Sequence, residues 1–125
     1  MELTKIELEV MNVLWNADRP LTKSEIMELS ENRSWKDSYK HLLINGLIKK
    51  GAIKESGVTK SGKVWAAVYD ANISCEDYFS KNVFAGSSRK VLPMLFNALI
   101  KTDGLSPELI DELEEMLKKK RQGMD

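Results

Sequence analysis

The sequence predicts a mostly helical protein that carries one small β-hairpin. Helix-capping signals recur along the chain, and apolar residues repeat at helical spacing over most of it. A single stretch, near residues 52–69, combines β-favouring residues with a glycine-containing turn. The 125 residues are 42% hydrophobic and 30% charged, which is ordinary for a folded protein. This length suits one domain, or a small domain with an appendage.

Two helices are expected at the N-terminus, over residues 4–16 and 23–31. Thr4 with Glu7, and Thr22 with Glu25, have the spacing of a capping box, in which the two side chains satisfy each other's free backbone N–H groups. Apolar residues line one face of the first helix: Leu3, Ile6, Val10, Val13 and Leu14. The second helix has only a narrow apolar stripe, which suits a short helix laid over a core.

A third helix is expected over residues 35–50. Ser34 with Asp37 repeats the capping spacing in its Asp form, and Gly51 after two lysines marks the end. Leu43, Ile44 and Leu47 form its apolar side. Polar side chains occupy the opposite side: Ser38, His41, Asn45 and Lys49.

Two β-strands follow, over residues 52–56 and 64–69, and a connection over residues 57–63 joins them. Positive charge is concentrated here, because residues 33–63 carry eight basic and two acidic side chains in a chain of zero net charge. A helix that fits a groove, followed by a cationic hairpin, is how a winged helix-turn-helix binds duplex DNA. We therefore predict a DNA-binding domain over residues 1–72, with recognition helix 35–50 and wing 57–63.

Specific contacts to double-stranded DNA can be assigned on this hypothesis. The candidates for base contacts are Ser38, Tyr39, His41 and Asn45, whose side chains can hydrogen-bond base edges. The candidates for phosphate contacts are Lys36, Lys40, Lys54, Lys60 and Lys63. The alternative is a solvated helix face with ordinary surface lysines. Three tryptophans are expected to pack in the core rather than to stack on bases: Trp15, Trp35 and Trp65.

Residues 73–125 form a second predicted domain, with helices beginning near residue 75, over 89–101 and over 107–121. Their apolar faces are too wide for a unit of this size to bury, so a second copy of the chain is the expected cover. A two-fold homodimer also matches a palindromic operator. The predicted dimer interface comprises Leu92, Leu95, Phe96, Leu99, Leu109, Leu113 and Leu117.

Several classes of protein are disfavoured. Cys75 is the only cysteine, so the chain can form neither an internal disulfide nor a cysteine-based metal cluster. No nucleophile with a matching base and no phosphate-binding loop is recognisable, so we predict no enzyme, no cofactor and no metal. The apolar runs are too short for a membrane span and the N-terminus does not resemble a signal peptide. We therefore expect a cytoplasmic protein.

Three segments resemble a known family: Glu7-Leu-Glu-Val-Met-Asn-Val-Leu-Trp15, Ser34-Trp35, and Leu47-Ile-Lys-Lys-Gly51. They are similar to the penicillinase repressor group, the bacterial repressors that respond to β-lactams, methicillin or copper. The resemblance implies a homodimeric transcriptional repressor with a winged-helix domain, a helical dimerisation domain and a dyad promoter site. It also implies a signal-transducing protease, still unidentified, as a partner.

Some family features are not matched. Tyr39, Lys40 and Gly46 stand where members commonly have other residues, so an operator sequence does not carry over. β-Lactam-responsive members are cut at an Asn-Phe bond, whereas this chain has Phe96-Asn97-Ala98. The Cys-x-Cys motif of the copper-responsive members is absent. The competing hypothesis is a winged-helix protein-interaction module, since a fold does not fix a function.

Overall fold

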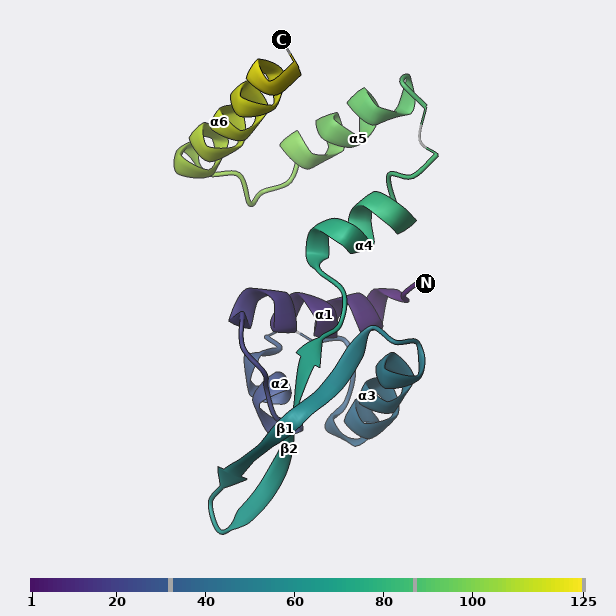
Figure 1. Ribbon diagram of the computed structural model, residues 1–125, viewed down its shortest axis with the longest axis vertical. Coiled ribbons are helices and arrows are strands. Elements are labelled where there is room, and N and C mark those ends of the chain that lie inside the picture. Colours follow the sequence, from purple (N-terminus) through teal and green to yellow (C-terminus); the bar gives the residue numbers. More distant parts are fainter. Residues whose placement is uncertain (32, 87, 125) are drawn as a thin grey trace. The chain divides into compact units, whose positions relative to one another are not determined.

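The structure is a computed structural model that describes residues 1–31, 33–86 and 88–124. Its contacts divide the chain into two units, Met1–Ala85 and Gly86–Asp125, each described by itself. The described part is mostly helical with one antiparallel hairpin, which confirms the predicted fold class (Figure 1). The first unit contains α1 (Lys5–Ala17), α2 (Lys23–Leu29), the 3₁₀ turn η1 (Asp37–Tyr39), α3 (Lys40–Lys49), β1 (Ile53–Ser61), β2 (Val64–Ala71) and α4 (Cys75–Asn82).

The first two helices begin where the sequence predicts. The Thr4 hydroxyl accepts from the Glu7 N–H at 3.2 Å, and the Glu7 carboxylate accepts from the Thr4 N–H at 2.9 Å. Thr22 and Glu25 form the same pair of bonds at 3.1 and 3.0 Å. Each box satisfies N–H groups that the first helical turn leaves free, an effect typically worth about 1 kcal/mol per cap.

The third helix begins later than predicted, and the proposed cap is wrong. The Ser34 hydroxyl donates to the Glu9 carboxylate of α1 at 3.0 Å instead of capping a helix. Trp35 is buried, Lys36 is extended, and the chain makes one 3₁₀ turn before α3 starts at Lys40. The reason is tertiary: burial of the Trp35 ring, together with the Ser34–Glu9 contact, holds residues 34–36 out of helical geometry.

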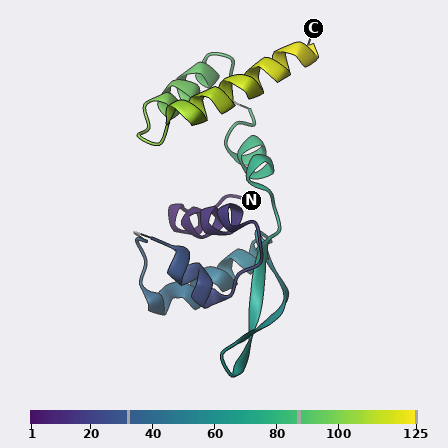
Figure 2. The ribbon, with the colours of Figure 1, turned by 90° about the vertical axis from the view of Figure 1, so that its left-hand side faces the viewer.

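The hairpin is longer than the sequence predicts. Its strands stay paired out to Ser61 and Val64, so Gly62 and Lys63 alone form the turn. Gly62 has φ +65°, and glycine at the first position suits a two-residue type II′ turn. Gly57, expected in the connection, instead follows a β-bulge, where the register shifts after Glu55. Figure 2 shows the narrow hairpin projecting beyond α2 and α3.

One hydrophobic core holds the first unit together. It draws on α1, α2, α3 and both strands, and its most deeply buried side chains are Val10, Met11, Leu14, Leu21, Ile26, Ile44, Leu47 and Ile53. Leu21, between α1 and α2, pairs with Tyr69 of β2 through two backbone hydrogen bonds of 2.9 and 2.8 Å. Strand β2 of the hairpin is thus tied by backbone hydrogen bonds to the segment that leads into α2.

The fourth helix packs on α1 within the same unit. The Leu3 N–H donates to the Tyr78 hydroxyl at 3.2 Å, and the Trp15 indole donates to the Ile73 carbonyl at 2.9 Å. The Tyr78 and Phe79 rings meet edge to face at 5.3 Å between centroids. The first compact unit therefore includes α4, and the expected functional division after residue 72 stays a prediction.

The second unit is a pair of helices, α5 (Val91–Ile100) and α6 (Pro107–Met124). The Ser106 hydroxyl caps α6 by accepting from the Leu109 N–H at 3.1 Å. No side chain described in these two helices is buried, and Leu95 and Leu113 are only half-buried. Among the described residues, no helix is long and apolar enough to cross a membrane.

Candidate nucleic-acid interface

The helix α3 buries one side and exposes the other. Leu43, Ile44 and Leu47 lie in the core, as predicted. The four side chains predicted for base contacts are all exposed: Ser38, Tyr39, His41 and Asn45. Ser38 and Tyr39 come from the 3₁₀ turn rather than from the α-helix. The structure brings the four onto one short, exposed segment, and their base contacts stay a prediction.

The same exposed face carries an apolar side chain that the sequence analysis missed. Leu42 is 66% exposed, and Ile48 is 39% exposed near the end of the helix. Helical periodicity alone predicts this exposure, because position 42 lies nearly opposite the buried stripe of Leu43, Ile44 and Leu47. Polar side chains alone do not reveal it, because an apolar residue on an exposed helix face carries no hydrogen-bonding signal.

A lysine from α2 also reaches this face. The Lys23 ammonium lies 3.0 Å from Nδ1 of His41 and 5.7 Å from the centroid of the Tyr69 ring. An ammonium group only donates, so in this contact Nδ1 accepts and a neutral His41 carries its proton on Nε2. His41 therefore offers a hydrogen-bond donor to a partner. Sequence could not place Lys23 here, because the contact depends on how α2 and α3 pack.

The two lysines near the start of α3 differ in environment. Lys36 is exposed and directly precedes η1. Lys40 is half-buried, and its ammonium lies 3.4 Å from the Asp37 carboxylate. Part of its charge is thereby compensated within the protein. Lys36 is thus the more available of the two for a phosphate.

The wing lysines Lys54, Lys60 and Lys63 are all exposed. Lys60 lies directly across the ladder from Trp65, which is 69% exposed. The prediction that Trp65 packs in the core is therefore wrong, because its end of β2 runs beyond the helices that supply the core. For Trp35 the prediction is confirmed, and Trp15 packs partly buried against the core.

The Lys50 ammonium is paired with groups of the same protein. Its ammonium lies 2.6 Å from the Glu7 carboxylate and 3.2 Å from the Glu2 carbonyl. Burial acts to raise the pKa of Glu7, but the Lys50 hydrogen bond, the Thr4 N–H and the Lys50 charge together hold that pKa below its ordinary value. Lys50 thus links the end of α3 to the start of α1.

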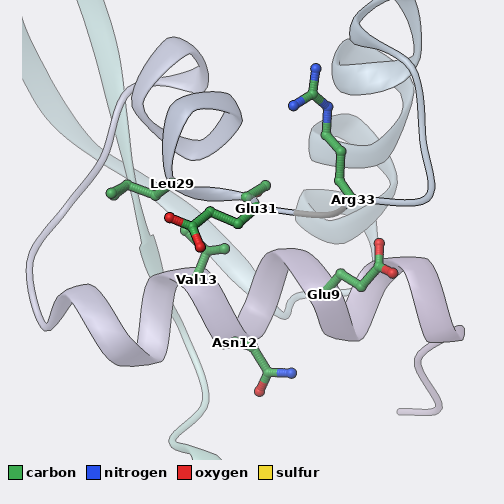
Figure 3. Close-up of a pocket in the computed structure, with 7 residues that line it drawn as sticks. Glu9, Asn12, Val13, Leu29, Glu31 and Arg33 are labelled. Atoms are coloured by element: carbon green, nitrogen blue, oxygen red, sulfur yellow. The ribbon is translucent and has the colours of Figure 1, made fainter.

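The first unit has a concave surface lined by residues of α1, the end of α2 and the segment after it. A cavity of about 280 Å³ lies between α1 and the end of α2, and Figure 3 shows Glu9, Asn12 and Val13 on its α1 side. Arg33, also part of its lining, stacks its guanidinium 5.5 Å from the centre of the Trp35 ring. In the described ranges, no cluster of three or more His, Cys, Asp or Glu side chains could hold a metal ion.

Comparison with known proteins finds a matching family and relatives that are named as repressors or regulatory proteins. The family model described as Penicillinase repressor matches residues 3–119. The penicillinase repressor of Bacillus licheniformis is 33% identical over 120 residues, covering 93% of this chain and 89% of that protein. The methicillin resistance regulatory protein MecI of Mammaliicoccus sciuri is 30% identical over 123 residues, covering 95% of each. A solution structure of the monomeric form of Bacillus licheniformis BlaI in complex with the blaP half-operator matches with a TM-score of 0.46 and 34% identity, over 62% of this chain and 89% of that one.

Proposed function

This chain belongs to the penicillinase repressor family, and we propose from that premise that it silences promoters by binding a dyad-symmetric site as a homodimer. It is a DNA-binding transcriptional repressor and not an enzyme. In the proposed complex, α3 lies in the major groove and the hairpin of β1 and β2 lies along the adjacent backbone. We place the protein in the cytoplasm, where a bacterial promoter is found.

The observation that carries the DNA-binding assignment is the exposed face of α3 beside a cationic hairpin. Ser38, His41 and Asn45 supply hydrogen-bonding groups suited to base edges. Lys36, on the approach to α3, and the wing lysines are exposed and suited to phosphates. The surrounding segment, residues 33–63, has a net charge of +6 although the chain is neutral, so the positive field is local.

The homodimer rests on the second unit. Five of the seven predicted interface residues are exposed there: Leu92, Phe96, Leu99, Leu109 and Leu117. Between α5 and α6 lies an apolar groove of about 410 Å³, whose lining includes Phe96, Leu99, Leu113 and Leu117. An exposed apolar surface shared by two short helices favours association with a like surface. The dyad of such a dimer would match the dyad of the DNA.

A protease that relieves repression completes the proposal. Asn97, in the Phe96-Asn97-Ala98 stretch that does not match the family's Asn-Phe dipeptide, lies in α5 with its carbonyl accepting from the Lys101 N–H at 3.1 Å. A protease cutting there must first unwind that helix. Mass spectrometry of the chain recovered after induction would show whether α5 is cut.

Gel-shift titration on the DNA upstream of its own gene tests the repressor. Four exposed lysines per protomer (Lys36, Lys54, Lys60 and Lys63) give a dimer about eight phosphate contacts, so log Kd should change with log salt with a slope near 7. A scrambled duplex serves as the control. Equal affinity for both duplexes at every salt concentration would refute specific repression.

A further inference from the structure

Leu42 lies on the surface that α3 presents outward. At about 100° per residue, Leu42 and Asn45 each lie roughly 30° from the direction opposite the buried stripe, whereas His41 lies about 70° from it. The exposed fraction of Leu42, 66%, agrees with this position. His41 and Asn45 are exposed on the same helix, and Tyr39, 43% exposed, lies in the preceding turn η1.

An isolated exposed leucine is common on protein surfaces and needs no explanation by itself. Leu42 differs because of its neighbours. It shares its exposed face with hydrogen-bonding side chains, in the most positively charged segment of the chain. This charge favours duplex DNA as the occupant of the face over an apolar protein surface, which would leave the lysines without partners.

We propose that Leu42 determines base specificity by packing against the 5-methyl group of a thymine in the major groove. The inference rests on the proposed function and names a residue and a base for it. The thymine methyl is the apolar feature of the major-groove edges, whose other groups are hydrogen-bond donors and acceptors. A leucine placed against a cytosine amino group would bury that donor without a partner. Leu42 thus selects a T·A pair at one position of each half-site.

Deoxyuridine differs from thymidine only by the missing methyl group, so it isolates this contact. Each thymine of the footprinted site is replaced singly, in both half-sites at once, and Kd is measured for the wild type. Losing one buried methyl should weaken binding about fourfold per half-site, or about fifteenfold for the pair. One symmetric position should show this loss.

The variant Leu42→Ala should weaken binding to the thymine duplex and show no further loss with deoxyuridine at that position. Leu29→Ala is the matched control, because Leu29 is 50% exposed on α2 and is not on α3. It should keep the full deoxyuridine penalty. Circular dichroism melts should show both variants folded, since alanine favours helix and neither leucine is buried.

The outcomes separate the inference from the proposed function. Site-specific binding with no deoxyuridine penalty, or with a penalty that Leu42→Ala leaves unchanged, overturns the assignment of Leu42 alone. Equal binding to the site and to scrambled DNA overturns the repressor proposal together with it. A protein partner that competes with DNA and loses affinity on Leu42→Ala, with no deoxyuridine penalty, would assign the face to protein contact instead.

Discussion

Replacing Lys50 with methionine should destabilise the first unit through Glu7. The ammonium of Lys50 lies 2.6 Å from a carboxylate whose side chain is only 9% exposed, while Lys50 itself is 38% exposed. Leaving a fully buried partner unpaired costs about 3–5 kcal/mol, and an exposed pair contributes about 0–1 kcal/mol. This half-exposed pair falls between, so we expect a loss of about 2 kcal/mol and a fall in Tm of roughly 10 °C.

The loss should depend on pH. The pKa of Glu7 in the folded protein lies below its ordinary value of 4.5. Its charged form therefore stabilises the fold fully above pH 4.5, and this contribution disappears as pH falls through the lower, folded value. The difference between wild type and Lys50→Met should be largest at neutral pH and shrink in acid.

Urea denaturation followed by tryptophan fluorescence measures this effect, because Trp15, Trp35 and Trp65 all lie in the first unit. Lys49→Met is the matched control, since Lys49 is exposed and carries the same charge, and it should change the free energy of unfolding by less than about 0.5 kcal/mol. Adding Glu7→Gln to Lys50→Met should cost less than the two single changes together. Equal midpoints for Lys50→Met and wild type at pH 7, or a difference that does not change with pH, would refute the reasoning.

Three further outcomes are expected. Lys60→Gln should lower the salt slope of the dimer by about two while keeping the preference for the site over scrambled DNA, because a phosphate contact carries no sequence information; an unchanged slope would remove Lys60 from the contacts. Trp35→Ala should cost about 3–5 kcal/mol in urea denaturation and Trp65→Ala less than about 0.5 kcal/mol, and similar costs would contradict the burial seen here. Leu95→Glu with Leu99→Glu should give monomers in sedimentation with loss of site affinity, whereas persistent dimers would place the interface elsewhere.

Sequence predicted best the features that depend on near neighbours in the chain. The boxes at Thr4 and Thr22 close within three residues, so local spacing was enough to place both helix starts. Ser34 carries the same local signal, but its hydroxyl bonds Glu9, which is 25 residues away. Nothing in the local pattern distinguishes the two situations, and the predicted start of the third helix was therefore wrong.

In the candidate site, too, the features that depend on near neighbours in the chain were the predictable ones. The exposed polar residues of α3 could be found from helical periodicity, since the apolar stripe fixes the opposite face. The contact of Lys23 with His41 could not, because it joins two helices. The prediction for Trp65 was wrong for another reason: residues 64–69 are apolar throughout, as in a core strand, and only the length of the hairpin shows that this end leaves the core.

The backbone bridge between Leu21 and Tyr69 bears on the spacing of the DNA in the proposed complex. It joins the segment before α2 to strand β2 of the hairpin, and α2 in turn contacts α3 through Lys23 and His41. The hairpin and α3 are therefore held at a set separation, by main-chain hydrogen bonds at Leu21 and by a side-chain contact between α2 and α3. In the proposed complex, one base pair inserted between the DNA under α3 and the DNA under the hairpin would move one contact by about 3.4 Å. The helix and the hairpin could then not make their contacts at the same time. Such a complex would select the spacing within a half-site as well as its bases.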